Sequence, residues 1–387
     1  MSVIMICALW NAPQYAQIPG LTSQSPWDMG GYVKYMATYS YPKEGKDNLD
    51  HLLHQRFNLE YRFDSGVSIN LGLRNRVLMG DSLDLPYYSQ YIERDSGYWD
   101  MSRNLVENDS VIVNSQLDRL FVDWQNDQWK ARVGRFRINW AMNTVWNPND
   151  LFNAYSIYDF DYEERAGSDA ILVGRQIGFA GGVEAAFSPS RDSELNSAAA
   201  RYYGNMRSWD YQLIIGKSLS DHVIGAGFAT DVLGAGLRAE LTWFDPTDSQ
   251  LTLEQQNQML VASSEVDYSF GGVRSWLMRV AWLYIDNPID IANAKSYLGL
   301  PLSAKTLSFT SHTTYLDLSF DLTPLNRMTL SSSYYQDNSY FIGVSNSYSL
   351  ANDWQFLTVL QHFGGRTKSL FGVNPTTMIF MNLKWSY

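Results

Sequence analysis

Three arginines lie close together near the middle of the sequence: Arg132, Arg135 and Arg137. A cluster of carboxylates follows them after a turn rich in Trp, Asn and Pro: Asp159, Asp161, Glu163 and Glu164. Guanidinium groups that face carboxylates across water set up a field, which attracts ions and orients polar solutes. This stretch is therefore the first candidate for a selective site, and its chemistry favours binding or passage over bond cleavage.

The other chemistry-bearing residues form no catalytic or metal-binding pattern. The histidines are scattered and lack metal-ligand spacing: His51, His54, His222, His312 and His362. The sequence has no GxSxG, P-loop or GxGxxG motif. We therefore expect no enzymatic activity, no metal and no cofactor. A hydrolase whose Ser–His pair is assembled only by the fold is the least favoured alternative.

Segments in which apolar and polar side chains alternate must position these groups. In 54–63, aromatic and leucine residues alternate with charged or amide residues such as Arg56 and Arg62. The charges lie well inside the segments, and aromatic residues such as Trp129 and Trp140 lie at their ends. A soluble sandwich also alternates, but charged interiors with aromatic ends are typical of a transmembrane antiparallel β-barrel.

Eighteen such segments can be counted along the chain. They are 31–41, 54–63, 67–78, 111–124, 129–139, 170–176, 182–187, 197–206, 209–217, 223–230, 236–244, 259–269, 276–285, 314–322, 327–335, 340–348, 355–363 and 377–387. The even-numbered connections are short, whereas the odd-numbered ones include every long loop: 79–110, 140–169, 245–258, 286–313 and 364–376. Bacterial barrels have even strand counts and segregate short turns from long loops. We therefore predict an all-β fold, a closed barrel of about 18 strands.

If the apolar faces point to lipid, the inward charges form two walls. The basic wall comprises Arg56, Arg62, Arg74, Arg76, Arg119, Arg132, Arg135 and Arg137. The opposite acidic wall comprises Glu240, Glu265, Asp267, Asp317 and Asp321. Arg135 and Arg137 point inward only if the alternation slips at Gly134, which predicts a β-bulge there. Alternatively, these charges only solvate the inner wall and pair with their neighbours.

The connection 140–169 is the third on the long-loop side. We predict that it folds into the barrel and brings Asp159, Asp161, Glu163 and Glu164 against the arginines as a constriction. A lid closed over the barrel mouth is the alternative. Within this connection, Asn147-Pro148-Asn149-Asp150 has the composition of a turn.

Composition limits the class of protein and its partners. The net charge is −11 and the sequence has no basic stripe, which argues against nucleic acid as a partner. Mean hydropathy is −0.25, and no apolar run reaches the roughly 20 residues of a membrane-spanning helix. We expect a partial export signal at 1–16, which holds the only cysteine, Cys7. A periplasmic lead-in at 17–29 and the barrel at 30–387, alternating up to Tyr387, complete the predicted organisation.

The segments GRFRINW (134–140) and VWNPNDLFNAYSIYDFDYEERAGSDA (145–170) carry a resemblance to a known family. They resemble a poorly characterised group of porin-like outer-membrane barrels that share the order Arg-x-Arg-Ile-Asn-Trp, Trp-Asn-Pro-Asn-Asp, Asp-Tyr-Glu-Glu-Arg. The position of the third loop resembles that of the constriction loop of porins. Elsewhere the resemblance is one of strand pattern alone.

The resemblance implies passive transport across the bacterial outer membrane. We expect a porin-like channel for diffusion of ions and small polar solutes. Its surroundings would be outer-membrane lipid, and its oligomeric state either a trimer or a monomer. A channel specific for sugars or small acids is an alternative, in which Phe121 beside Arg119 and Asp123 stacks on a sugar ring. A plugged barrel with a structural or surface-binding role is another.

Overall fold

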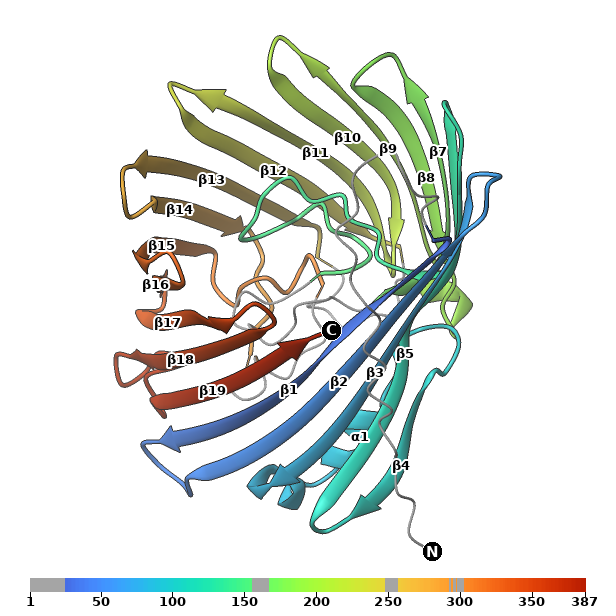
Figure 1. Ribbon diagram of the computed structural model, residues 1–387. Coiled ribbons are helices and arrows are strands. Elements are labelled where there is room, and N and C mark those ends of the chain that lie inside the picture. The colour runs from blue at the N-terminus through green and yellow to red at the C-terminus, as the bar shows by residue number, and fades with distance from the viewer. Residues whose placement is uncertain (1–24, 155–166, 248–256, 292–293, 295–296, 298–302) are drawn as a thin grey trace, which may run out of the picture.

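The chain forms one antiparallel sheet. The computed structural model describes residues 25–154, 167–247, 257–291, 294, 297 and 303–387. The sheet has nineteen strands, of which eighteen close into a barrel (Figure 1). The barrel strands are β1 (Trp27–Pro42), β2 (Asn48–Arg62), β3 (Val67–Gly80), β5 (Val111–Gln125), β6 (Trp129–Phe136), β7 (Ser168–Ile177), β8 (Gly181–Ser188), β9 (Ser197–Met206), β10 (Trp209–Ser218), β11 (Asp221–Val232), β12 (Ala235–Pro246), β13 (Met259–Gly271), β14 (Trp276–Ile285), β15 (His312–Thr323), β16 (Asn326–Tyr335), β17 (Ser339–Ala351), β18 (Trp354–Gly365) and β19 (Thr376–Ser386). Among the described residues, no helix is long and apolar enough to cross a membrane.

The barrel closes where β1 pairs with β19 along most of its length. At the end of this pairing, Tyr387 and Gly31 exchange two backbone hydrogen bonds of 3.0 Å each. The Tyr387 hydroxyl donates to the backbone carbonyl of Arg56 at 2.8 Å. Glycine is needed at position 31 because a Cβ there would lie 2.1 Å from that same carbonyl oxygen. The first and last strands are therefore joined by both backbone and side-chain contacts.

The eighteen strands predicted from alternation are confirmed, and most of their ends lie within one or two residues of the predicted ones. β9 and β14 begin and end at the predicted residues. β1 begins at Trp27, inside the stretch expected to be a lead-in. β6 ends at Phe136, before the predicted residue 139, because the chain leaves the wall there. The segregation of short turns and long loops between the two ends of the barrel is also present.

The connection between β3 and β5 holds elements that alternation did not predict: η1 (Asp81–Asp84), α1 (Tyr88–Glu93) and β4 (Ser102–Asn108). β6 pairs with β5 only from Leu120 to Gln125. β4 pairs with the same edge of β5 from Val111 to Gln116. The loop therefore supplies the piece of wall that β6 vacates. β4 escaped prediction because its seven residues are mostly polar and show little alternation.

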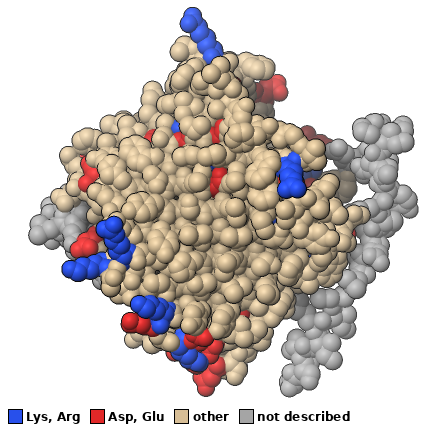
Figure 2. Space-filling view, turned by 90° about the vertical axis from the view of Figure 1, so that its left-hand side faces the viewer, with Lys and Arg blue, Asp and Glu red and all other residues tan. Residues whose placement is uncertain are grey.

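Cross-strand pairing assigns each residue to the outer or the inner face of the barrel. Large exposed apolar side chains cover the outer face, as at Ile69 on β3, Val122 on β5 and Leu213 on β10. Figure 2 shows one side of the molecule, where charged side chains gather toward the edges and the middle is nearly free of them. A soluble protein buries such side chains, so this surface suits contact with lipid.

Gly134 does not form the predicted bulge. The pairs Phe121–Gly134 and Gly134–Ala170 continue the ladders on both sides of β6 without a register shift. Glycine is required for a different reason: its φ is +124°, and a Cβ would lie 2.2 Å from the Leu120 carbonyl oxygen. Because the alternation does not slip, Arg132 and Arg135 lie on opposite faces of the strand, and the predicted inward position of Arg135 is wrong.

Apolar clusters lie inside the barrel, where inner-face side chains meet the long connections. One joins Phe136, Ile138 and Trp140 to inner residues of β7, β8, β9 and β10. Another joins Val145 and Trp146 to inner residues of β11 to β14. A third, near the β14–β15 connection, is aromatic: Tyr297, Tyr335, Phe341, Phe363 and Phe371. These clusters fasten the long connections to the inside of the wall.

Candidate functional site

The connection between β6 and β7 enters the barrel. Its described part, residues 137–154, is called the inward loop below, and Figure 1 shows it within the ring of strands. The prediction of an inward fold is right for these residues, and a lid above the rim is not what they form. The predicted constriction residues lie outside the described residues: Asp159, Asp161, Glu163 and Glu164.

Trp140 holds the first part of the inward loop against β8 and β10. Its side chain is 1 % exposed, and its Nε1 donates to Glu184 at 2.8 Å. Its carbonyl accepts a 2.6 Å hydrogen bond from Gln212 Nε2. The ring of Phe152, near the other end of the loop, packs edge-on against Trp140 with centroids 5.3 Å apart. A buried indole with its N–H satisfied is a rigid contact, so both ends of the loop are fixed on this side.

Glu240 on β12 binds the middle of the inward loop through the loop's backbone. Its carboxylate is 2 % exposed and accepts hydrogen bonds from the amides of Met142, Asn143 (2.7 Å) and Asn149 (3.0 Å). Hydrogen bonds to a charged acceptor are stronger than neutral ones. Three of them on one buried carboxylate therefore tie the loop firmly to β12.

Glu265 on β13 makes a second attachment next to the first. It is 1 % exposed and accepts from the amides of Thr144 (2.8 Å) and Val145 (3.0 Å) and from the Thr144 hydroxyl (2.6 Å). Arg238 Nη1 lies 3.1 Å from the same carboxylate. Together, Glu240 and Glu265 hold the loop across the interior, from β6 to β12 and β13.

The predicted turn at 147–150 is present at the far end of the loop. It closes with a 3.1 Å hydrogen bond from its last amide to its first carbonyl. The fully buried Asn149 donates its side-chain amide to the Ala226 carbonyl at 3.0 Å, and the Thr242 hydroxyl lies 2.7 Å from Asn149 Oδ1. Gly225 leaves the space, because a Cβ there would lie 2.7 Å from the same Oδ1. The tip is thus bound to β11 and β12.

Most residues of the predicted basic wall lie on the inner face. Several of them form ion pairs or hydrogen bonds with neighbouring residues. The inner-face members on β2, β3, β5 and β6 are Arg56, Arg62, Arg74, Arg76, Arg119 and Arg132. Arg56 forms a bidentate, nearly fully buried ion pair with Asp118. Arg76 donates to Asn114 at 2.9 Å and to the Ile92 carbonyl at 3.2 Å. These arginines therefore bind wall and helix neighbours.

The predicted acidic wall also lies on the inner face: Glu240, Glu265, Asp267, Asp317 and Asp321. Arginines on the same strands neutralise much of it. Arg238 contacts two of these carboxylates, Arg279 lies 3.5 Å from Asp317, and Arg327 lies 2.8 Å from Asp321. The field expected between two walls of unlike charge is therefore weakened, and two of the acidic residues hold the inward loop instead.

Pockets lie along the inner face near β5, and the smaller of those described here borders the start of the inward loop. One has a volume of about 410 Å³ and lies between β1, β2, β3 and β5, with Arg119 and Phe121 in its wall. The other, of about 230 Å³, is lined by four basic and two acidic residues: Lys130, Arg132, Arg137, Arg201, Asp123 and Glu184. Its basic residues outnumber its carboxylates, so it carries positive charge next to the loop. Of these residues, sequence reasoning missed Arg201 and Glu184, although the alternation of their strands already indicated that both point inward.

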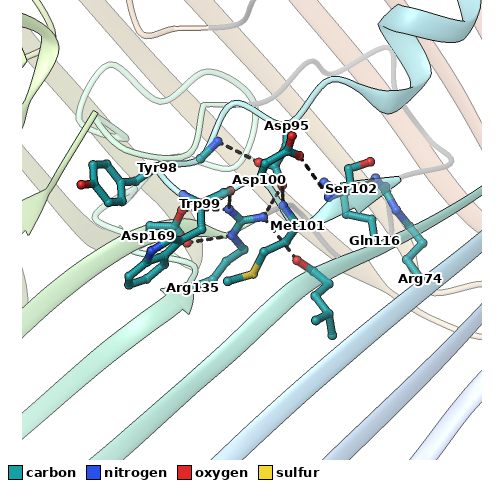
Figure 3. Close-up of polar contacts among 12 residues, drawn as sticks. Arg74, Asp95, Tyr98, Trp99, Asp100, Met101, Ser102, Gln116, Arg135 and Asp169 are labelled. Carbon is teal, nitrogen blue, oxygen red and sulfur yellow. Dashed lines mark hydrogen bonds and ion pairs between the residues drawn. The ribbon is translucent and has the colours of Figure 1, made fainter. Parts of the chain in front are cut away.

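Arg135 belongs to a buried network at the end of β6 and does not line the lumen (Figure 3). Its Nε and Nη2 each donate to Asp169 at 2.8 Å, and its Nη1 donates to Asp95 at 2.5 Å. The carbonyls of Leu117 and Trp99 accept at 3.3 and 2.7 Å. A guanidinium has five N–H donors, and these contacts use all of them. Arg135 is therefore a clamp in the wall.

The same network fixes the loop segment 95–101 over the ends of β6 and β7. Asp95 also accepts from the amides of Gly97 (2.8 Å) and Met101 (3.0 Å). Burial raises the pKa of Asp95, but the hydrogen bonds from Arg135 and these amides outweigh it and hold the pKa below its usual value. Gly97 lies so close that a Cβ would stand 2.0 Å from an Arg135 nitrogen. The segment thus seals the wall beside β4.

Solved structures share this architecture, although no protein-family model and no curated protein matches the sequence. Pseudomonas aeruginosa OccK11 (OpdR) gives a TM-score of 0.58 at 8 % identity, over 93 % of this chain and 95 % of that one. Acinetobacter baumannii OccAB4 gives 0.58 at 10 %, over 94 % and 98 %. Pseudomonas aeruginosa OpdK, solved with vanillate, gives 0.54 at 10 %, over 93 % and 99 %. At such low identity the likeness establishes the fold, a porin-like 18-strand barrel.

Proposed function

We propose that the protein is a porin-like channel of the bacterial outer membrane, through which ions and small polar solutes diffuse. The apolar outer face supports a lipid environment, since only a closed barrel or a helix leaves no backbone group unsatisfied there. Barrels of this strand number are wide enough to hold an aqueous lumen. The solved structures that share the fold are outer-membrane channels, which supports the same role here.

The inward loop carries the proposal. A structural barrel has no need of a loop that crosses its interior and is fastened by two buried carboxylates, Glu240 and Glu265. Such a loop narrows the lumen at a defined height, and its backbone attachments keep that width constant. The positive pocket beside it then meets each solute that passes. The arrangement is that of a constriction.

Purified protein in a planar lipid bilayer is expected to give discrete conductance steps. Charge reversal at two pocket residues, Arg132→Glu with Arg137→Glu, is expected to shift the reversal potential toward cation preference, because it replaces positive with negative charge at the narrow part. Arg103→Glu is the matched control, since its side chain is 79 % exposed on β4. Absence of steps would contradict the channel, and would favour a plugged barrel with a binding role. Unchanged selectivity would contradict the pocket's part in it.

A channel for small acids is the second candidate, favoured by the excess of cations around the 230 Å³ pocket. OpdK, which shares the fold, was solved with vanillate, an aromatic acid. Flux of a small carboxylate such as benzoate into liposomes is then expected to saturate, whereas glucose flux rises linearly. Arg201→Gln is expected to weaken the saturation, because Arg201 lines the pocket and stacks on Trp140 at 5.5 Å. Saturable glucose flux with linear benzoate flux would favour a sugar channel.

The segments 134–140 and 145–170 support a narrower assignment, to the group of porin-like barrels that share their motif order. We place the chain in that group as part of the proposal. Within the described residues, members of the motif have structural roles in this barrel. Arg135 clamps the wall, Trp140 anchors the loop, and Asn149 binds its tip to β11 and β12.

A further inference from the structure

Two phenylalanine rings enclose the guanidinium of Arg132 on the inner face. Arg132 Cζ lies 4.9 Å from the centroid of Phe121 and 5.3 Å from that of Phe136. The two rings also contact each other, with centroids 5.8 Å apart. Arg132 Nε donates to Asp123 at 2.6 Å, yet the side chain remains 36 % exposed. The cation is therefore fixed in orientation while it stays open to the pocket.

The other basic residues of this pocket are engaged differently. Lys130 and Arg201 converge on the buried Glu184, which neutralises one of their charges. Arg137 lies 3.9 Å from Asp150 of the inward loop. The terminal nitrogens of Arg132, by contrast, make no hydrogen bond to any residue that the structure describes. Arg132 thus presents its donors to whatever passes the constriction.

The two rings differ in how far they can be changed. Phe136 is 1 % exposed and belongs to the apolar cluster that begins the inward loop, so its replacement would disturb the loop itself. Phe121 is only partly buried and lines the 410 Å³ pocket on its other side. Because Arg132 lines the 230 Å³ pocket, the Phe121 ring stands between the two spaces. Phe121 packs only at the margin of that cluster, so a change there disturbs the loop less than a change at Phe136.

We propose that Phe121 is a positioning residue for charge selectivity: its ring holds Arg132 in the orientation that presents the Nη edge to passing anions. The inference rests on the proposed channel function and deepens it. A cation–π contact restricts the rotamers of a long side chain, so the charge stays at one place in the lumen. Without the ring, Arg132 keeps its charge but spreads it over many positions, and each anion meets a weaker field.

The test is the reversal potential of bilayer-reconstituted protein in a KCl gradient, with variants that leave the net charge unchanged. Phe121→Leu is expected to lower the chloride-to-potassium permeability ratio roughly two- to five-fold, the factor by which losing one partly exposed cation–π contact shifts an equilibrium. Phe121→Tyr retains the ring and is expected to keep the wild-type ratio. Phe187→Leu makes the same change on the outer face, where the side chain is 42 % exposed, and serves as the matched control.

The Arg132→Gln background shows whether Phe121 acts through Arg132. In that background Phe121→Leu is expected to cause no further change. A further shift there, or an unchanged ratio when Phe121→Leu is introduced into the wild type, would overturn the inference and leave the channel standing. Absence of any conductance in the wild type would overturn both. If Phe121→Leu does not fold, Phe121→Met removes the ring with less change of shape and decides the matter.

Discussion

Replacing Arg135 with methionine is expected to destabilise the folded barrel by about 3–5 kcal/mol, the usual cost of removing one partner from a buried ion pair. The guanidinium is 2 % exposed, and the partner carboxylates of Asp95 and Asp169 are 4 % and 1 % exposed. Without Arg135, both would stay buried with no cation beside them. Methionine fills similar volume, so the loss reports the missing donors. Urea unfolding of vesicle-reconstituted protein, followed by tryptophan fluorescence, measures it.

The matched control is Arg62→Met, because Arg62 pairs with Glu60 and Asp28 while half exposed. Such an exposed pair is screened by water and contributes little to stability, so this variant should unfold near the wild type. The triple change Arg135→Met, Asp95→Asn, Asp169→Asn removes the unmatched charges and is expected to recover part of the lost stability. A loss of less than about 1 kcal/mol in Arg135→Met would show that water reaches the network.

The double change Glu240→Ala, Glu265→Ala is expected to increase single-channel conductance and its fluctuation. The backbone amides of 142, 143, 144, 145 and 149 would lose their acceptors together. A hydrogen bond to a charged group contributes about 1.5–3 kcal/mol, and about 1.4 kcal/mol is a tenfold change in population. The undocked loop should therefore become common. Planar-bilayer recordings under identical salt compare the two proteins.

Asp321→Ala controls for the loss of negative charge, since Asp321 lies on the same wall but pairs with Arg327. A reversible lock is also available. Asn143 Nδ2 lies 2.5 Å from Ser263 Oγ, so Asn143→Cys with Ser263→Cys places two thiols across the attachment. The variant that combines these two cysteines with Glu240→Ala and Glu265→Ala should return to the wild-type conductance when a disulfide forms under oxidation. Reduction of that disulfide should release the loop and restore the higher conductance. Equal conductance in the wild type and the double variant would mean that the inward loop does not set the width.

Alternation predicted the strands well because a barrel strand has a different environment on each face along its whole length. The ends of β9 and β14 were predicted to the residue. Loop lengths added independent information, since only a barrel separates short from long connections by their parity. β4 was missed because it is held by backbone pairing with one edge of β5. Such pairing does not require apolar and polar side chains to alternate, so the sequence carries no pattern for it.

Arg135 was misplaced for a specific reason. Phe136, Ile138 and Trp140 were taken as lipid-facing, and that reading required the alternation to slip at Gly134. These residues are instead buried inside the barrel, against the inner faces of β7 to β10. The same apolar residue types occur in an internal cluster and on a lipid-facing surface. The sequence therefore does not distinguish these two positions.

The role of Glu240 and Glu265 as attachments of the inward loop was not predicted, for a different reason. Glu240 and Glu265 were correctly placed on the inner face but interpreted as charges that act on solutes. Their partners are backbone amides of the inward loop, and amides occur at every residue except proline. A contact of that kind leaves no side-chain pattern for a reader of the sequence. Only the path of the loop shows which carboxylates it meets.

The contact between Gly31 and Tyr387 bears on how fast and in what order the barrel forms. Most neighbouring strands are consecutive in the sequence and pair as hairpins, whose local contacts form quickly. The seam between β1 and β19 instead joins residues from nearly opposite ends of the sequence. Until the seam forms, β1 and β19 each present a row of unpaired backbone groups, which is the part of a sheet most prone to aggregation. Closure is thus expected to be the slowest step, and a cell that makes this protein would have to protect two open edges until it is complete.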